Sequence, residues 1–128
     1  MRLIDLNTDY DTLCSWWKSY DWPPIPLEAL PQQGLIIDGV CAGFIYQTDS
    51  SIALMEWIVG NKQSNAILRE EKLTELVVGL KSMAKTLGFT TVFSAVKHPN
   101  LIKIYENNGL VATDSHMHHF MGATQEAS

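Results

Sequence analysis

Three apolar runs follow one another between Gly34 and Val59, and they constrain the fold of this chain more than any other feature. They cover residues 34–38, 40–46 and 52–59, and they are separated by Asp38-Gly39 and by a polar stretch at 48–51. An Asp-Gly pair between apolar runs is a strong hairpin signal, because these residues tolerate the positive φ of a tight turn. We therefore expect three consecutive antiparallel strands.

Apolar residues with helical spacing follow the third strand. Those between Leu73 and Leu87 recur at intervals of three and four, and Gly88 can end such a helix. The β-rich residues 89–96 predict another strand. Pro99 suits the first position of a short helix whose apolar face is formed by Leu101, Ile104 and Tyr105.

The two ends of the chain complete the expected order. Residues 2–6 predict a short strand, and Thr8 with Asp11 resembles the start signal of a helix that reaches about Tyr20. Residues 21–31 contain four prolines, which exclude a regular helix or a central strand. Residues 110–113 and 118–121 predict two final strands.

The composition indicates one ordered globular domain, 1–128. The chain has 128 residues, of which 46% are hydrophobic and 18% are charged, so it can bury one core. No apolar run is long enough to cross a bilayer, and residues 1–5 lack the core of a signal peptide. Cys14 and Cys41 lack CxxC spacing, which favours reduced thiols. We expect a cytoplasmic protein without a membrane partner.

The net charge of −5, without a Lys/Arg cluster, argues against general nucleic-acid binding. An acidic surface is compatible with a cationic substrate such as an amine. His116, His118 and His119 are accompanied only by Asp114 at ligand spacing, which is an incomplete metal site. We therefore expect no metal.

The segment from Val96 to Leu110 predicts the end of a strand, a turn, a short helix and a stop. It resembles the last motif of the GNAT acetyltransferases, the GCN5-related family that transfers an acyl group from coenzyme A to an amine. The motif positions are occupied here by Asn100, Tyr105, Gly109 and Leu110. The order of elements resembles a GNAT domain over nearly the whole chain. The resemblance implies an α/β (α+β) fold: a mixed, mostly antiparallel central sheet of about six to seven strands with helices on both faces.

The same resemblance implies an N-acetyltransferase that moves an acetyl group from acetyl-CoA directly to a primary amine. Glu56 matches the family's general base, which acts through water because a protonated amine has no lone pair for attack. Tyr105 matches the general acid that reprotonates the leaving thiolate. Two structural alternatives stay open: Glu56 faces solvent or pairs with a lysine, and Tyr105 is a core tyrosine.

The resemblance also assigns residues to the cofactor and the acceptor. The cofactor positions are Ile58, Gly60, Gln63, Ser64, Asn65, Ala66 and Asn100. Trp22, Ile25 and Leu27 lie in the segment that lines the acceptor groove of the family. The phosphate loop departs from the family's Arg/Gln-x-x-Gly-x-Gly/Ala pattern, because residues 61–71 contain no glycine to let the backbone approach phosphate. Lys62 or Arg69 could supply positive charge there.

The glycine-free loop leaves other functions open. One is a non-catalytic GNAT-fold module that binds a protein partner, and another is an acyl-CoA sensor without turnover. The compact size and the altered loop are also similar to divergent GNAT-like proteins of tailed bacteriophages, for which a virion or host-cytoplasm location follows. A homodimer formed through the late strands is compatible with the resemblance.

Overall fold

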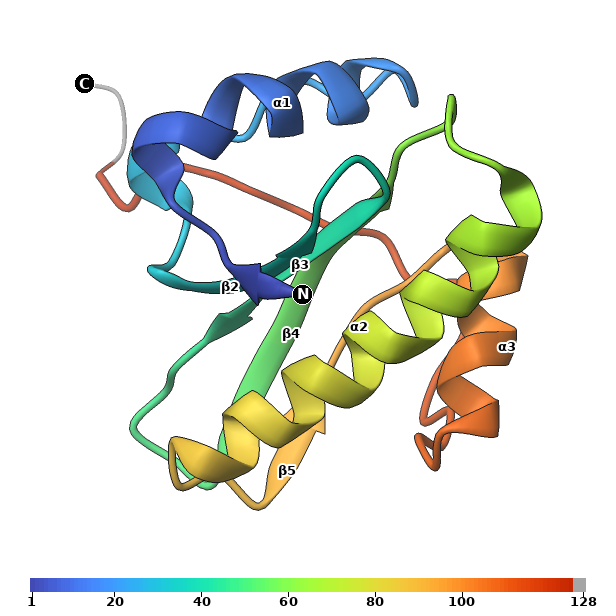
Figure 1. Cartoon of the computed structure of the whole chain (residues 1–128). Helices are drawn as coiled ribbons and strands as arrows, with labels where there is room; N and C mark the ends of the chain where they lie inside the picture. Colours follow the sequence, from blue (N-terminus) through green and yellow to red (C-terminus); the bar gives the residue numbers. More distant parts are fainter. Residues whose placement is uncertain (126–128) are drawn as a thin grey trace.

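A computed structural model describes residues 1–125 and shows one five-stranded sheet with helices on both faces (Figure 1). The strands, in their order across the sheet, are β1 (Arg2–Leu3), β2 (Gln33–Ile37), β3 (Cys41–Tyr46), β4 (Ile52–Gly60) and β5 (Thr91–Phe93). Strands β1 to β4 pair antiparallel, whereas β5 pairs with β4 in parallel. This parallel pairing requires a long crossover, which the helix between them supplies.

In the described part of the chain, three α-helices and one short 3₁₀ helix accompany the sheet: α1 (Leu6–Lys18), η1 (Leu27–Ala29), α2 (Ala66–Thr86) and α3 (Pro99–Asn107). Each α-helix begins at a side chain that accepts a backbone N–H. Asp5 accepts from Asn7, Asn65 accepts from Leu68, and the ring of His98 accepts from the N–H of the second α3 residue. The predicted start near Thr8 was wrong, because Asp5 is the residue that caps α1. Among residues 1–125, no helix is long and apolar enough to span a membrane.

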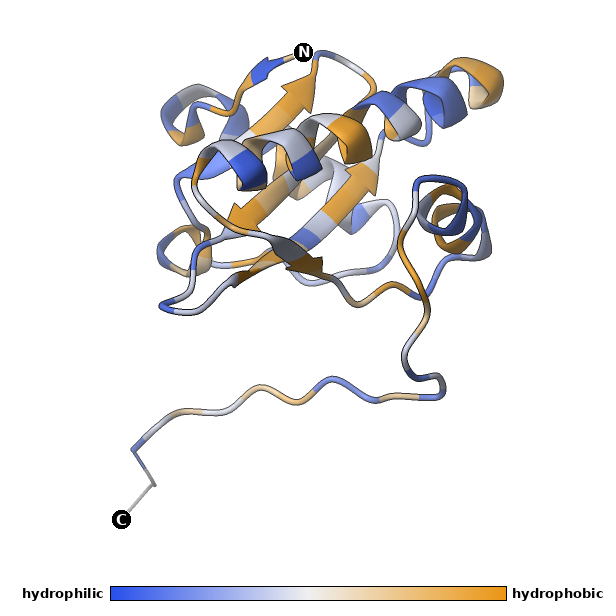
Figure 2. Cartoon of the chain, turned by 90° about the horizontal axis from the view of Figure 1, so that it is seen from below, coloured by the Kyte–Doolittle hydropathy of each residue, from blue (hydrophilic) through white to orange (hydrophobic). Residues whose placement is uncertain are grey.

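The two faces of the sheet carry separate cores. Helices α2 and α3 cover one face, and Leu76, Leu80 and Ile104 pack there against β3 and β4. Helix α1 and the proline-rich segment cover the other face, where Trp17 is completely buried. Figure 2 shows the strongest hydrophobic colour on the strands, whereas each helix mixes both colours. Each helix therefore buries one stripe and leaves the opposite side polar.

A β-bulge in β4 changes which face its residues point to. Ala42 of β3 pairs with Val59 and Phe44 pairs with Glu56, so Gly43 lies opposite two β4 residues. One of those two is Trp57, which has a φ of 58°. The extra residue shifts the alternation by one, so that Trp57 packs toward the α1 face.

Residues 108–125 contain no strand, so the expected count of six to seven strands was too high: the described chain has five. Residues 110–113 and 118–121 bury little, and Val111 and Phe120 are 85% and 94% exposed. Figure 1 shows this segment in red, running behind the sheet on the side opposite α2. Strand β5 pairs over three residues only, and so short an edge gives further strands little to pair with.

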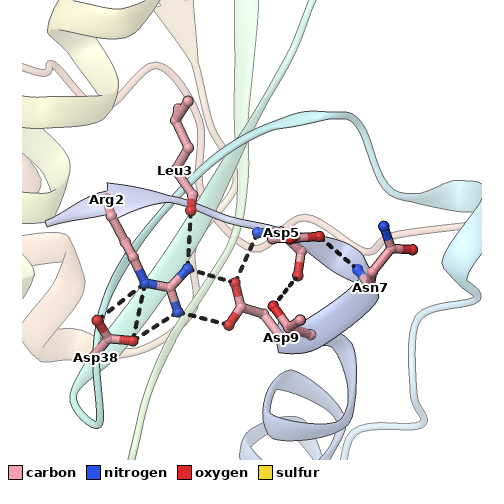
Figure 3. Close-up of polar contacts among 7 residues, drawn as sticks. Arg2, Leu3, Asp5, Asn7, Asp9 and Asp38 are labelled. Carbon is pink, nitrogen blue, oxygen red and sulfur yellow. Dashed lines mark hydrogen bonds and ion pairs between the residues drawn. The ribbon is translucent and has the colours of Figure 1, made fainter.

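A charged cluster fastens the first strand to its neighbours (Figure 3). The guanidinium of Arg2 donates two hydrogen bonds to Asp9 of α1, at 2.8 and 2.9 Å, and also binds Asp38 of the β2–β3 turn. Asp9 is buried and accepts a further hydrogen bond from the N–H of Asp5 at 2.8 Å. Arg2 therefore connects β1, α1 and the hairpin through one planar group.

Candidate active site

Strands β4 and β5 separate after a short stretch of pairing. Their register ends at Leu54 and Phe93, although β4 continues to Gly60. Beyond this point, side chains replace the backbone ladder: the Ser94 hydroxyl donates to the carbonyl of Met55. The two strands therefore diverge and leave backbone groups of β4 available along the gap.

Glu56 lies where the strands diverge. Its Oε1 accepts a hydrogen bond from the N–H of Ala95 at 3.1 Å, and the side chain is half-buried. Burial raises the pKa of the Glu56 carboxyl above its ordinary value, while the Ala95 N–H and His119 partly oppose this effect. The carboxyl group thus has the environment expected of a general base for chemistry nearer neutral pH.

An open hollow of about 420 Å³ lies beside Glu56. Its walls are largely aromatic and apolar. They are formed by Tyr46, Leu54, Glu56, Trp57, Phe93, Ala95, His119, Phe120 and Met121. The bulge in β4 is the reason that Trp57 lies beside Glu56 in this wall instead of pointing to the opposite face of the sheet.

Tyr105 of α3 reaches the same region from the α2 face of the sheet. It is buried, with its Oη 2.7 Å from the Ser94 Oγ. Because the Ser94 hydrogen is donated to Met55, Tyr105 is the donor between the two hydroxyls. Burial raises the pKa of Tyr105, so its phenol stays protonated at neutral pH. The predicted base and acid thus contact adjacent residues that follow β5: Glu56 accepts from Ala95, and Tyr105 donates to Ser94.

The loop between β4 and α2 is organised by Arg69 instead of by glycine. The Nη1 of Arg69 donates to the carbonyls of Asn61 and Ser64, both at 2.9 Å, and of Lys62 at 3.2 Å. Gly60 makes room for this side chain, since a Cβ there would lie 2.7 Å from the Arg69 Cδ. Three carbonyls consequently point toward Arg69.

Backbone N–H groups at the start of α2 remain available. Within residues 1–125, the N–H groups of Asn65, Ala66 and Ile67 form no hydrogen bond. Free N–H groups at a helix start favour an anion such as a diphosphate. Lys62 is engaged elsewhere, because its Nζ donates to the Ser19 carbonyl at 2.7 Å and lies 4.3 Å from the centre of the Tyr20 ring.

The other expected cofactor residues take varied positions. Ile58 is buried on the α2 face, where it packs beneath Gly43. The Gln63 N–H donates to the Asn61 side chain, and its own side chain is exposed. Asn100 is exposed at the start of α3.

The expected acceptor residues do not line the hollow beside Glu56. Trp22 is 40% exposed and packs on Tyr20, Ile25 is buried in the α1-side core, and Leu27 is exposed in η1.

Sequence reasoning missed four residues of this region: Tyr46, Trp57, Ser94 and Phe93. Their roles depend on the bulge and on pairing between β4 and β5, and no local sequence signal marks them. The described residues contain no group of three side chains suited to a metal.

Solved structures match this fold over nearly its whole length. The protein TTHA1254 from Thermus thermophilus, solved as a point mutant, superposes with a TM-score of 0.69 at 15% identity, over 97% of this chain and 98% of its own. A candidate acetyltransferase from Agrobacterium tumefaciens gives a TM-score of 0.66 at 14% identity, over 94% and 98% of the two chains. An acetyltransferase from Trypanosoma brucei gives 0.63 at 13% identity, over 94% and 97%.

The chain has the GNAT acetyltransferase fold. The diverging strands β4 and β5 and the loop before α2 therefore belong to the fold that the sequence resemblance implied. Neither a protein-family model nor a curated protein matches the chain significantly. At identities of 13–15%, the structural likeness shows the GNAT fold and leaves the reaction to be argued from the residues.

Proposed function

We propose that this protein transfers an acetyl group from acetyl-CoA to a primary amine, with Glu56 as general base and Tyr105 as general acid. The observation that carries the proposal is that Glu56 contacts Ala95 and Tyr105 contacts Ser94, two adjacent residues at the divergence of β4 and β5. Acyl transfer needs a base to free the amine lone pair and an acid for the departing sulfur. Burial raises the pKa of both groups, which makes the Glu56 carboxylate a stronger base and keeps the Tyr105 phenol protonated.

Acetyl-CoA would enter as a substrate and supply the acetyl group as a thioester. The free N–H groups of Asn65, Ala66 and Ile67 are suited to its diphosphate, and the gap beside β4 from Ile58 to Gly60 is suited to its pantetheine arm. We propose that acetyl-CoA also contacts Gln63, Ser64 and Asn100. The residues present therefore fit this substrate without a glycine-rich loop.

In the proposed reaction, water carries the ammonium proton to the Glu56 carboxylate. The amine nitrogen then forms a bond to the thioester carbonyl carbon, and N–H groups along β4 stabilise the oxygen that becomes negative. The C–S bond breaks, and the thiolate takes the hydroxyl proton of Tyr105. The proton that the nitrogen loses as the amide forms returns through water to the Tyr105 phenolate. Tyr105 must turn its O–H from Ser94 toward the sulfur, so Ser94 holds the proton donor in place before the step.

The first test is the thermal midpoint with and without millimolar acetyl-CoA, with ADP as control. A ligand at about 100 times its dissociation constant stabilises by about 2.7 kcal/mol, which amounts to several degrees for a domain of this size. A shift followed by thiol release with an amine supports the proposal. A shift without thiol release indicates an acyl-CoA sensor, and no shift indicates a protein-binding module.

The location and the oligomeric state of the protein are also proposals. We propose a cytoplasmic location and self-association through the segment after α3, whose apolar side chains Val111, Met117 and Phe120 are exposed. Sedimentation equilibrium of the full chain tests self-association. The similarity to phage-encoded GNAT-like proteins is likewise a prediction from the sequence.

A further inference from the structure

The hollow beside Glu56 presents aromatic surface instead of polar groups. The Trp57 Nε1 donates to the Tyr46 Oη at 2.7 Å, and Tyr46 donates in turn to the Ala29 carbonyl at 2.7 Å. The polar atoms of both side chains are therefore occupied by protein partners. Phe93 is 53% exposed and adds a third ring. What the hollow offers a ligand is mainly ring surface.

Within residues 1–125, Glu56 is the only acidic residue in the lining of the hollow. Among residues 1–125, no lysine or arginine lines it, and Glu56 forms no ion pair. Glu56 uses only Oε1 within the described chain, for the Ala95 N–H. The basic group in the lining is His119, from the segment after α3. A half-buried carboxylate that forms no ion pair is costly, and a cationic ligand facing it would lower that cost.

We propose that the acceptor is a primary amine on an aromatic body that carries no carboxylate beside the amine. This inference rests on the proposed acetyl transfer and names its substrate class. The ammonium would face Glu56, and the aromatic body would lie against Tyr46, Trp57 and Phe93, where ring faces also attract the cation. An α-carboxylate would be repelled by Glu56 and would find no lysine or arginine in the hollow.

Three simple amines test separately the need for an aromatic ring and the exclusion of an α-carboxylate. Phenylethylamine has the ring and the amine, phenylalanine adds an α-carboxylate, and ethanolamine lacks the ring. With acetyl-CoA and thiol release as readout, kcat/KM for phenylethylamine should exceed that of each other amine by at least about tenfold. Equal or faster acetylation of phenylalanine or ethanolamine would overturn the inference and leave acetyl transfer standing.

A substitution in the wall of the hollow tests whether the hollow causes the preference for an aromatic amine. Phe93→Ser removes one exposed ring and should lower the ratio of kcat/KM between phenylethylamine and ethanolamine by about tenfold. Val78→Ser removes a similarly exposed apolar side chain from α2 and should leave the ratio unchanged. An unchanged ratio in Phe93→Ser would assign the preference to another surface, against the proposal.

A binding measurement separates this inference from the proposed function. Phenylethylamine added to the full chain should shift the NMR signal of the Trp57 indole N–H, with a smaller shift from phenylalanine. If acetyl-CoA neither stabilises the protein nor is consumed, but this selective shift occurs, acetyl transfer is wrong and the ligand class of the hollow stands. If no amine is acetylated and none shifts the signal, the inference is overturned.

Discussion

The backbone N–H of Ala95 donates to the carboxylate of Glu56 at 3.1 Å, just beyond the last pair between β4 and β5, Leu54 and Phe93. A side chain thus takes the acceptor position that a backbone carbonyl would hold in a continued ladder. The same hydrogen bond orients the carboxyl group, so the candidate base is positioned by the divergence of the two strands.

Glu56→Gln should lower kcat/KM by about 10² to 10⁴-fold, because the amide can still accept from Ala95 but cannot take a proton. The deficit should be largest between the raised pKa of Glu56 and the pKa of the amine, and it should shrink where the amine is already neutral. A pH profile of kcat/KM checks this. Asp49→Asn removes an equal charge from an exposed turn and serves as control. A profile of unchanged shape would assign the base to another group.

Tyr105→Phe should reduce kcat more than it changes KM, since the hydroxyl is proposed to act on the leaving sulfur. The lost bond to Ser94 should also cost about 1 kcal/mol of unfolding free energy. Tyr10→Phe removes a comparable hydroxyl, bonded to the Ile25 carbonyl at 2.7 Å, and is the matched control. Full activity in Tyr105→Phe with only the stability loss would leave Tyr105 a core tyrosine.

Arg69→Gln should loosen the loop between β4 and α2, because three carbonyls lose a shared donor. We expect faster amide hydrogen exchange at 61–66 and about tenfold weaker binding of acetyl-CoA in calorimetry. Lys72→Gln, on the same helix, breaks only an exposed pair with Glu75 and should change neither quantity. Unaltered exchange in Arg69→Gln would show that the loop holds its form without this contact.

Asp9→Asn should lower the unfolding free energy by about 2 kcal/mol near neutral pH, because Asp9 is buried and binds both Arg2 and the Asp5 N–H. Arg2 holds the pKa of Asp9 below its ordinary value, so this stability is present above the ordinary aspartate pKa and is lost as pH falls through the lowered one. Urea unfolding of wild type and variant should therefore converge in acid. Asp11→Asn, exposed on the same helix, should show little difference at either pH.

Much of the element order could be predicted from local signals. The Asp38-Gly39 turn and the start of α3 at Pro99 are both found where neighbouring residues indicate them. The boundaries were less accurate: α1 begins at Leu6, and the strand expected at 89–96 covers only Thr91–Phe93. The predictions of strands at 110–113 and 118–121 were wrong, because an apolar run forms a strand only beside an edge that can pair with it.

The sequence by itself determined the succession of strands and helices as far as α3, the lone carboxylate at Glu56 within an apolar strand, and the tyrosine of the last motif. These follow from short-range periodicity and turn chemistry. Only the tertiary structure decided that Trp57 joins Glu56 in one wall, that Ser94 holds Tyr105, and that Arg69 replaces glycine in shaping the loop. Those outcomes depend on a bulge and on contacts between distant segments, whose energies no local pattern records.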